Sequence, residues 1–131
     1  MKNNYRLGID IGSTTVKIAI LDENNNIIFS DYERHYANIQ ETLAALLVKA
    51  RKEINENVTL MPSITGSGGL TLSKHLDIPF TQEVVAVATA LNDYAPQTDV
   101  AIELGGEDAK IIYFTNGVEQ RMNGICAGGT G

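Results

Sequence analysis

The stretch from residue 7 to residue 21, LGIDIGSTTVKIAIL, constrains the fold most, because a short polar turn separates two runs of β-forming residues. On both sides of the turn, apolar side chains recur at every second position, a period that predicts strands. The alternating residues are Tyr5, Leu7, Ile9 and Ile11 before the turn, and Val16, Ile18 and Ile20 after it. The pattern predicts a β-hairpin whose tip, Gly12, Ser13 and Thr14, exposes hydroxyls and backbone N–H groups. Such donors can bind an anion together.

Two other phosphate-binding motifs do not fit the same residues. A dinucleotide-binding turn needs three glycines in register and a helix after them. Here the glycines fall at Gly8 and Gly12, and the β-branched run TVKIAI follows. The Walker pattern, in which a lysine and a hydroxyl residue follow the second glycine, is absent. A plain hairpin with a polar turn and no ligand stays open as the alternative to an anion site.

Length and charge narrow the class of protein. A chain of 131 residues predicts one compact domain, or one domain and part of another. The net charge of −6 argues against a nucleic-acid partner or an anionic membrane surface, because both attract clustered lysine and arginine. No apolar run approaches the roughly 20 residues of a membrane-spanning helix, and the first residues lack a signal-peptide pattern. We therefore expect a cytoplasmic protein.

The last residues of the chain, 126–131, read CAGGTG, which is typical of a loop. Because domains seldom end inside such a loop, we expect the chain to be the N-terminal part of a longer protein. Cys126 is the only cysteine, so no disulfide bond can form within the chain.

The residues after the hairpin predict a mixed α/β domain. We expect a third strand from residue 27 towards Tyr32, and a fourth over residues 58–65. Between them, Asn38 is expected to cap a helix, with Glu41 completing a capping box. The helix carries one apolar stripe that we expect to face the core. The stripe comprises Ile39, Leu43, Leu46, Leu47, Ala50 and Ile54.

Two further helices are expected after the fourth strand. A glycine loop over residues 66–69 leads into a short helix over residues 70–76, and the loop either faces an anion or is only a flexible turn. Thr81 is expected to cap a helix over residues 82–92, which is apolar almost all round and should therefore be buried. His35 and His75 lie near neither acidic motif, so we expect both at the surface.

This order of elements predicts a mixed five-stranded sheet, with three antiparallel strands first and parallel pairing after a crossover. The polar segment after the last helix contains Pro96 and breaks the helical pattern. We therefore expect a first lobe over residues 1–96 and the start of a second lobe over residues 97–131.

The opening stretch recurs later in the chain. When the sequence is shifted by 93 residues, Asp10 and Lys17 fall on Glu103 and Lys110 without a gap. In both copies a strand ends in an acid, an apolar residue and a glycine, a short polar tip follows, and a second strand carries the lysine. A further strand follows in each copy. The match predicts a duplicated unit.

Two hairpins that each carry an acid suggest a clamp around a polyphosphate. Asp10 and Glu103 are then candidate catalytic residues that together hold a hydrated Mg²⁺. Magnesium prefers one or two carboxylates, with water and substrate phosphates completing its shell. The candidate nucleotide-binding residues are Gly12, Ser13, Thr14, Thr15 and Lys17 in the first copy, and Gly105, Gly106, Glu107 and Asp108 in the second. Lys17 is either a phosphate contact or an ordinary surface lysine.

These motifs resemble those of a known family. Residues 8–17, GIDIGSTTVK, are similar to the first phosphate motif of the ATPase superfamily of actin, Hsp70 and sugar kinases, and residues 103–110, ELGGEDAK, to its second. Their form, with the loop NGICAGGTG at residues 123–131, resembles the BadF/BadG/BcrA/BcrD family of ATP-dependent activators of 2-hydroxyacyl-CoA dehydratases and benzoyl-CoA reductase. The resemblance spans nearly the whole chain and implies a ribonuclease H-like, actin-type ATPase fold.

The resemblance implies a function that spacing alone does not. It implies a homodimer that binds ATP and Mg²⁺, shares one [4Fe-4S] cluster between its subunits, and hydrolyses ATP to drive an electron to a partner dehydratase. Cys126 matches the first cluster ligand of each subunit, and the second would lie outside this chain. We expect the full-length protein to be an ATPase and this part to be inactive alone.

Two alternative functions stay open within the same superfold. One is a small-molecule kinase, which would need a substrate pocket and no role for Cys126. The other is a non-catalytic actin-like module that uses nucleotide only to set domain closure or assembly.

Overall fold

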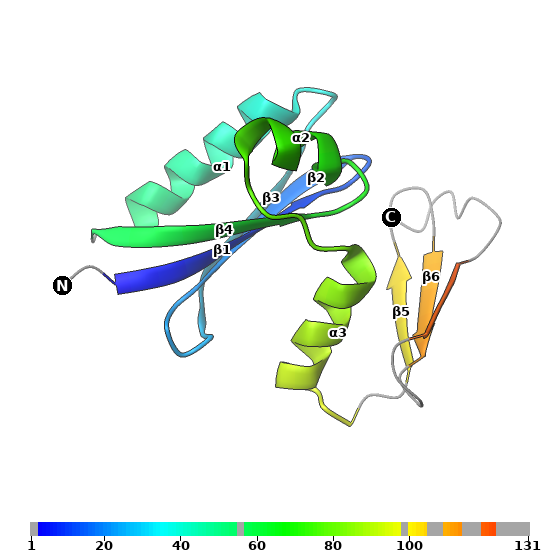
Figure 1. The fold of residues 1–131 in the computed structure, drawn as a ribbon. Helices are drawn as coiled ribbons and strands as arrows, with labels where there is room; N and C mark the ends of the chain where they lie inside the picture. Colours follow the sequence, from blue (N-terminus) through cyan, green and yellow to red (C-terminus); the bar gives the residue numbers. More distant parts are fainter. Residues whose placement is uncertain (1–2, 55–56, 98–99, 105–108, 114–118, 123–131) are drawn as a thin grey trace. The chain divides into compact units, whose positions relative to one another are not determined.

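The protein forms two compact units, Met1–Phe80 and Thr81–Gly131. They are seen in a computed structural model that describes residues 3–54, 57–97, 100–104, 109–113 and 119–122 (Figure 1). The boundary expected between residues 96 and 97 stays a prediction.

The first unit is built on a four-stranded mixed sheet. Its strands are β1 (Asn3–Ile11), β2 (Thr15–Leu21), β3 (Ile27–Arg34) and β4 (Val58–Thr65), in the order β3-β2-β1-β4 (Figure 1). β2 pairs antiparallel with both β1 and β3, whereas β4 pairs parallel with β1. The predicted change from antiparallel to parallel pairing is therefore confirmed.

The predicted count of five strands in this sheet is wrong for the residues that the structure describes. Beyond β4, pairing is reduced to a single parallel bridge between Ile64 and Phe80, in which the Ile64 N–H donates to the Pro79 carbonyl at 2.9 Å. Pro79 has no N–H group of its own, so this segment cannot continue a regular ladder. Pro62 is tolerated within β4 because β4 is the last full strand of the sheet.

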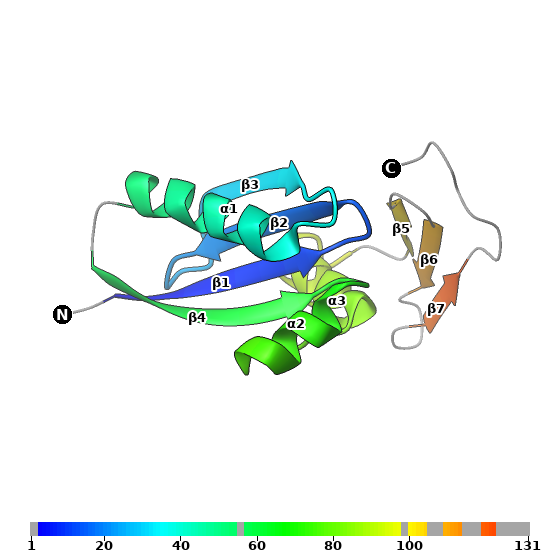
Figure 2. The same cartoon turned by 90° about the horizontal axis from the view of Figure 1, so that it is seen from above.

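One face of the sheet is covered by helices α1 (Ile39–Glu53) and α2 (Gly69–Leu76), which lie side by side over it in Figure 2. The predicted stripe of α1 is confirmed, since Leu43, Leu46 and Ala50 are buried and the other members are partly buried. α1 contacts β2 and β3, and α2 contacts β4. The buried side chains of both helices join the alternating residues of β1 and β2 in one cluster. The buried core comprises Tyr5, Leu7, Ile9, Ile11, Val16, Ile18, Ile20, Leu43, Leu46, Ala50, Ile64 and Leu72.

The start of α1 lies where the sequence predicts it, but the predicted capping box is wrong. Asn38 precedes the helix and its side chain makes no capping hydrogen bond. The backbone of Asn38 bonds to the first turn of the helix instead. Its carbonyl accepts from the Thr42 N–H at 3.0 Å and from Thr42 Oγ1 at 2.7 Å. The Asn38 N–H donates back to the His35 carbonyl at 2.6 Å. This places Asn38 at φ −101° and ψ 65°, away from the extended backbone of a usual cap.

The third helix, α3 (Glu83–Tyr94), differs from its prediction in two ways. The N-cap residue is Gln82, whereas the sequence predicted Thr81. None of the residues of α3 is buried, so the prediction of a buried helix is wrong. The helix belongs to the second unit. No helix among the described residues is both long and apolar enough to span a bilayer.

The second unit contains an antiparallel sheet in the order β5-β6-β7, formed by β5 (Val100–Leu104), β6 (Ala109–Tyr113) and β7 (Glu119–Met122). Its first hairpin has the register that the sequence repeat predicts. Asp10 pairs with Lys17 across β1 and β2, and Glu103 pairs with Lys110 across β5 and β6. The match supports the predicted duplication, because strand register is specified independently in each sheet.

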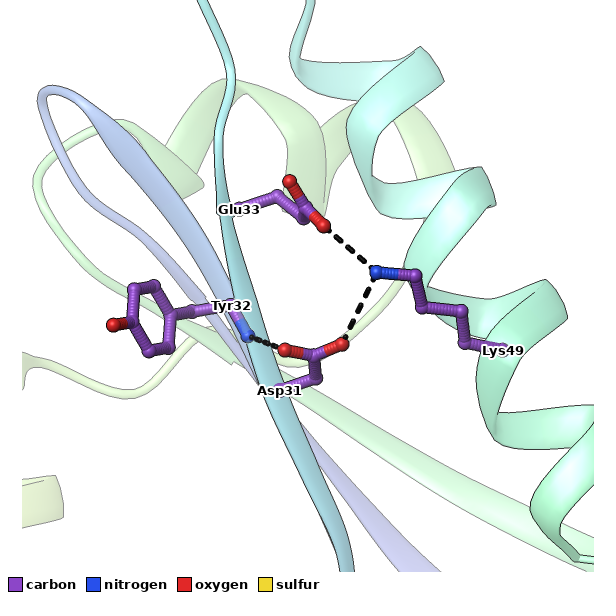
Figure 3. Close-up of polar contacts among 4 residues, drawn as sticks. All are labelled: Asp31, Tyr32, Glu33 and Lys49. Atoms are coloured by element: carbon purple, nitrogen blue, oxygen red, sulfur yellow. Dashed lines mark hydrogen bonds and ion pairs between the residues drawn. The ribbon is translucent and has the colours of Figure 1, made fainter.

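Helix α1 is also tied to the sheet at its surface. The Lys49 ammonium lies 2.7 Å from Glu33 Oε1 and 3.3 Å from Asp31 Oδ2, both on β3 (Figure 3). Asp31 Oδ1 in turn accepts from the Tyr32 N–H at 2.8 Å. The hydrogen bond to Glu33, followed by that to Asp31, raises the pKa of Lys49 above its ordinary value of 10.5. The group is half exposed, so the ion pair acts as a surface contact that salt weakens.

The raised pKa of Lys49 makes its contribution to stability dependent on pH. A group whose pKa is higher in the folded state stabilises the fold at pH values below its unfolded pKa, and this contribution disappears as pH rises through the folded pKa. We therefore expect Lys49→Met to be less stable than wild type at neutral pH, and the difference to disappear at an alkaline pH above the raised pKa of Lys49. Urea unfolding at both pH values measures the difference.

Lys52→Met is the matched control for this experiment. Lys52 lies on the same helix and makes no ion pair within the described part of the chain. Its substitution should give a small difference that does not change with pH. A Lys49→Met difference of equal size at both pH values would contradict the assignment.

Candidate functional site

The predicted hairpin tip is present as a tight turn between β1 and β2. The Gly12 N–H donates to the Thr15 carbonyl at 2.9 Å and closes the turn. Ser13 is exposed, while Gly12, Thr14 and Thr15 are partly buried. Below the tip, Ile11 and Val16 pair across the two strands and are fully buried. The tip is thus a short exposed loop mounted on a rigid, buried base.

Asp10 lies one residue before the end of β1, on the side of the sheet away from the helices. Its neighbours Ile9 and Ile11 point into the core, and side chains alternate along a strand, so Asp10 points to the other face. It pairs with Lys17 of β2 on one side and with Thr65 of β4 on the other. Asp10 is partly buried and Lys17 is exposed. A contact between Lys17 and nucleotide stays a prediction.

Thr65 is a neighbour of Asp10 that the sequence did not single out. Its hydroxyl oxygen is buried and has no hydrogen-bond partner among the described residues. Buried hydroxyls are nearly always bonded in proteins, and leaving one unpaired costs about 1–3 kcal/mol. The Thr65 hydroxyl is therefore a buried polar group beside Asp10 that the described residues leave without a hydrogen bond.

The glycine loop after β4 packs directly against this end of β1. The Gly68 N–H donates to the Ile11 carbonyl at 2.9 Å. Gly66 has φ +100°, and a Cβ atom there would lie 2.5 Å from Asp10 Oδ1 and even closer to the Ile11 carbonyl oxygen. The loop is therefore packed against the end of β1, and the choice between an anion-facing loop and a simple turn stays open. Whether the loop touches nucleotide stays a prediction.

His35 is also part of this end of the sheet, and its predicted surface position is wrong. It is buried, with 8% of its surface exposed, and its Nε2 atom lies 3.1 Å from the Gly12 carbonyl oxygen. The His35 N–H donates to the Thr14 carbonyl at 3.0 Å. His75 is exposed, as predicted. No sequence signal connected His35 with the hairpin, because the two segments are 23 residues apart.

The candidate residues of the second copy are only partly within the described chain. Glu103 lies in β5, one residue before its end, as Asp10 does in β1. The predicted approach of Glu103 to Asp10 stays a prediction. Five other candidates lie outside the described residues: Gly105, Gly106, Glu107, Asp108 and Cys126.

Comparison with known proteins decides the family. A model described as the BadF/BadG/BcrA/BcrD ATPase family matches residues 7–131. The chain belongs to this family. The match covers both hairpins with their acids, Asp10 and Glu103.

Two relatives of this family member carry activator names. The 2-hydroxyisocaproyl-CoA dehydratase activator of Clostridioides difficile is 31% identical over 136 residues, which is 97% of this chain and 48% of the relative. The (R)-2-hydroxyglutaryl-CoA dehydratase activating ATPase of Acidaminococcus fermentans is 28% identical over 132 residues, 97% of this chain and 50% of the relative. The chain thus spans about half the length of these curated relatives.

A solved structure has the same fold. The activator of the 2-hydroxyisocaproyl-CoA dehydratase from Clostridium difficile, with bound ADPNP, superposes with a TM-score of 0.71 at 28% identity. The superposition covers 91% of this chain and 45% of the activator. The predicted ribonuclease H-like, actin-type ATPase fold is confirmed.

The contact between Gly66 and β1 gives a direct test of the site's construction. Gly66→Ala should destabilise the fold by about 2–4 kcal/mol, because it combines a left-handed backbone with a clash against main-chain and carboxylate atoms. Urea unfolding measures this loss as a lower midpoint with an unchanged slope.

Gly8→Ala is the matched control within β1. A Cβ atom at Gly8 would meet its nearest neighbour, the Ala19 carbonyl oxygen, at 3.9 Å, an ordinary contact. This variant should be at least as stable as wild type, because alanine loses less backbone entropy than glycine in a strand. Equal stabilities of the two variants would show that the loop does not pack as described.

Proposed function

We propose that this chain is the N-terminal part of an ATP-hydrolysing activator that drives electron transfer to a 2-hydroxyacyl-CoA dehydratase or a related CoA-thioester enzyme. The observation that carries the proposal is the hairpin tip with Asp10 beside it, in a chain of the BadF/BadG/BcrA/BcrD ATPase family. The names of the two activator relatives, and the ADPNP bound in the solved activator, support the same reading.

The residues of the tip would hold the phosphates of ATP by donating hydrogen bonds. Ser13 and Thr14 offer backbone N–H groups and two hydroxyls on the turn, whereas the Gly12 N–H already donates to the Thr15 carbonyl. Such closely spaced donors favour a polyanion without adding flexible charged side chains. Phosphoryl transfer needs little covalent chemistry from the protein, so fixed donors and correct positioning account for most of the catalysis.

Asp10 would act on the reacting end of ATP by holding a hydrated Mg²⁺. Asp10 offers a carboxylate next to the unpaired Thr65 hydroxyl, a donor set that suits a cation keeping most of its water. When bound, Mg²⁺ would neutralise phosphate charge and polarise the γ-phosphate. We propose Glu103 as the second carboxylate and Gly105, Gly106, Glu107 and Asp108 as the second set of nucleotide contacts.

The iron–sulfur part of the proposal concerns Cys126. The resemblance implies two cysteine ligands from each subunit of a homodimer, and this chain supplies one. We propose Cys126 as a ligand of a [4Fe-4S] cluster, together with a second cysteine outside this chain. No step of the mechanism is derived through the cluster, because Cys126 lies outside the described residues.

Asp10→Asn tests the role of the carboxylate in the full-length protein. We expect ATP hydrolysis, measured as phosphate release, to fall at least about 100-fold, because the amide cannot hold the cation. Affinity for ATP should change much less, since the tip donors are retained. Asp31→Asn is the matched control, since Asp31 lies on the same sheet at the Lys49 ion pair, and it should hydrolyse ATP normally. Hydrolysis that survives Asp10→Asn would remove Asp10 from the mechanism.

Cys126→Ser tests the proposed cluster. Full-length protein purified without oxygen should contain iron and absorb visible light, and Cys126→Ser should lose both. Iron content and the visible spectrum measure this. Wild-type protein that holds no iron, while still hydrolysing ATP, would favour a kinase over the activator, whereas protein that holds no iron and does not hydrolyse ATP would favour the non-catalytic actin-like module.

A further inference from the structure

His35 makes two hydrogen bonds to the hairpin tip, although it lies in a different segment of the chain. It directly follows β3 and lies at the start of the link to α1. Two of its nitrogens bond to carbonyls of the tip: ring Nε2 to the Gly12 oxygen at 3.1 Å, and the backbone N–H to the Thr14 oxygen at 3.0 Å. A single buried residue thus bonds to both ends of the three-residue turn.

The hydrogen bonds define which ring nitrogen of His35 carries the proton. The Ala37 N–H donates to Nδ1 at 3.0 Å, so Nδ1 must present a lone pair. The proton of the neutral ring is then on Nε2, which donates it to the Gly12 carbonyl. Each ring nitrogen has one partner and one role, and the opposite tautomer would break both bonds.

The segment that follows His35 is held in an unusual backbone conformation to make these bonds. Tyr36 has φ 45° and Ala37 has φ 66°, both in the left-handed region that residues other than glycine rarely adopt. The Asn38 N–H returns to the His35 carbonyl at 2.6 Å. Such a conformation persists only where surrounding contacts fix it, and it brings the Ala37 N–H onto Nδ1.

The bonds made by His35 determine where N–H groups of the tip point. In a planar trans peptide, the carbonyl oxygen and the next N–H lie on opposite sides. The Gly12 oxygen faces His35, so the Ser13 N–H faces away from it. The Thr14 oxygen also faces His35, so the Thr15 N–H faces away as well. His35 therefore aims two donors to the side of the turn that it does not itself occupy.

We propose that His35 is a positioning residue that aims the Ser13 and Thr15 N–H groups at the phosphate chain of the nucleotide. The proposal rests on the proposed function, because it assigns a ligand to the tip. His35 itself does not touch the nucleotide. Donors that are fixed before binding lose no orientational freedom when the ligand arrives, and they therefore bind it more tightly.

Two substitutions separate the ring's two roles. In His35→Gln, the amide nitrogen can reach the place of Nε2 and donate to the Gly12 carbonyl, while the partner of Ala37 is lost. In His35→Asn, the amide oxygen can take the place of Nδ1 and accept from Ala37, while nothing reaches Gly12. Comparing the two variants therefore separates the effect of the hydrogen bond to Gly12 from that of the hydrogen bond with Ala37.

We expect the affinity of the full-length protein for ADPNP, measured by calorimetry, to fall roughly tenfold in His35→Asn and to stay within about threefold of wild type in His35→Gln. The backbone order parameters of Ser13 and Thr15 should fall in His35→Asn alone, because the tip loses the bond that fixes the Gly12 carbonyl. If His35 only stabilised the fold, the two variants would not differ in this way in their affinity for ADPNP. Unchanged affinity in a folded His35→Asn protein would overturn the proposal.

A measurement on the wild type does not depend on folded variants. The nitrogen chemical shifts of the His35 ring should show the Nε2–H tautomer, and the Nδ1–H tautomer would overturn the proposal. The proposed function fails separately: a wild-type protein that does not bind ADPNP contradicts it, and the role of His35 falls with it. A wild type that binds ADPNP, with an Asn variant of equal affinity, contradicts only the role of His35.

Discussion

The pairing of Ile11 with Val16 is the contact on which the rest of this end of the molecule depends. Both side chains are fully buried, and they lie directly below the turn. Side chains alternate along each strand, so burying these two forces Asp10 and Lys17 onto the opposite face. The Ile11 carbonyl also accepts from Gly68 and thereby attaches the loop after β4. One buried pair thus fixes the position of the turn, the acid and the glycine loop.

Most of the fold could be predicted from the sequence, because it is encoded in local periodicity. The alternation in β1 and β2 and the stripe of α1 each depend on neighbours in the sequence, and the structure bears them out. The predicted count of five strands was wrong because Pro79 has no N–H group to continue the pairing. That Pro79 lies beside Ile64 of β4 could be seen only in the structure.

The surroundings of the site were harder to predict, because they depend on contacts between distant segments. Nothing near His35 indicates that its ring reaches Gly12, and no pattern around Gly66 shows that its Cα approaches Asp10. The capping box failed for the same reason, since the Asn38 N–H is occupied by His35. Sequence patterns predicted the residues that would contact a ligand, whereas the structure was needed to find the residues that hold them in place.

The register of the two hairpins has an electrostatic consequence. Asp10 is directly opposite Lys17, and Glu103 is directly opposite Lys110, so each acid of the repeat has a cation as its cross-strand neighbour. Opposite charges in such pairs offset one another at short range. The chain carries a net charge of −6, yet each of these two cross-strand pairs is close to neutral. An incoming anion therefore meets little local repulsion from either of these two acids.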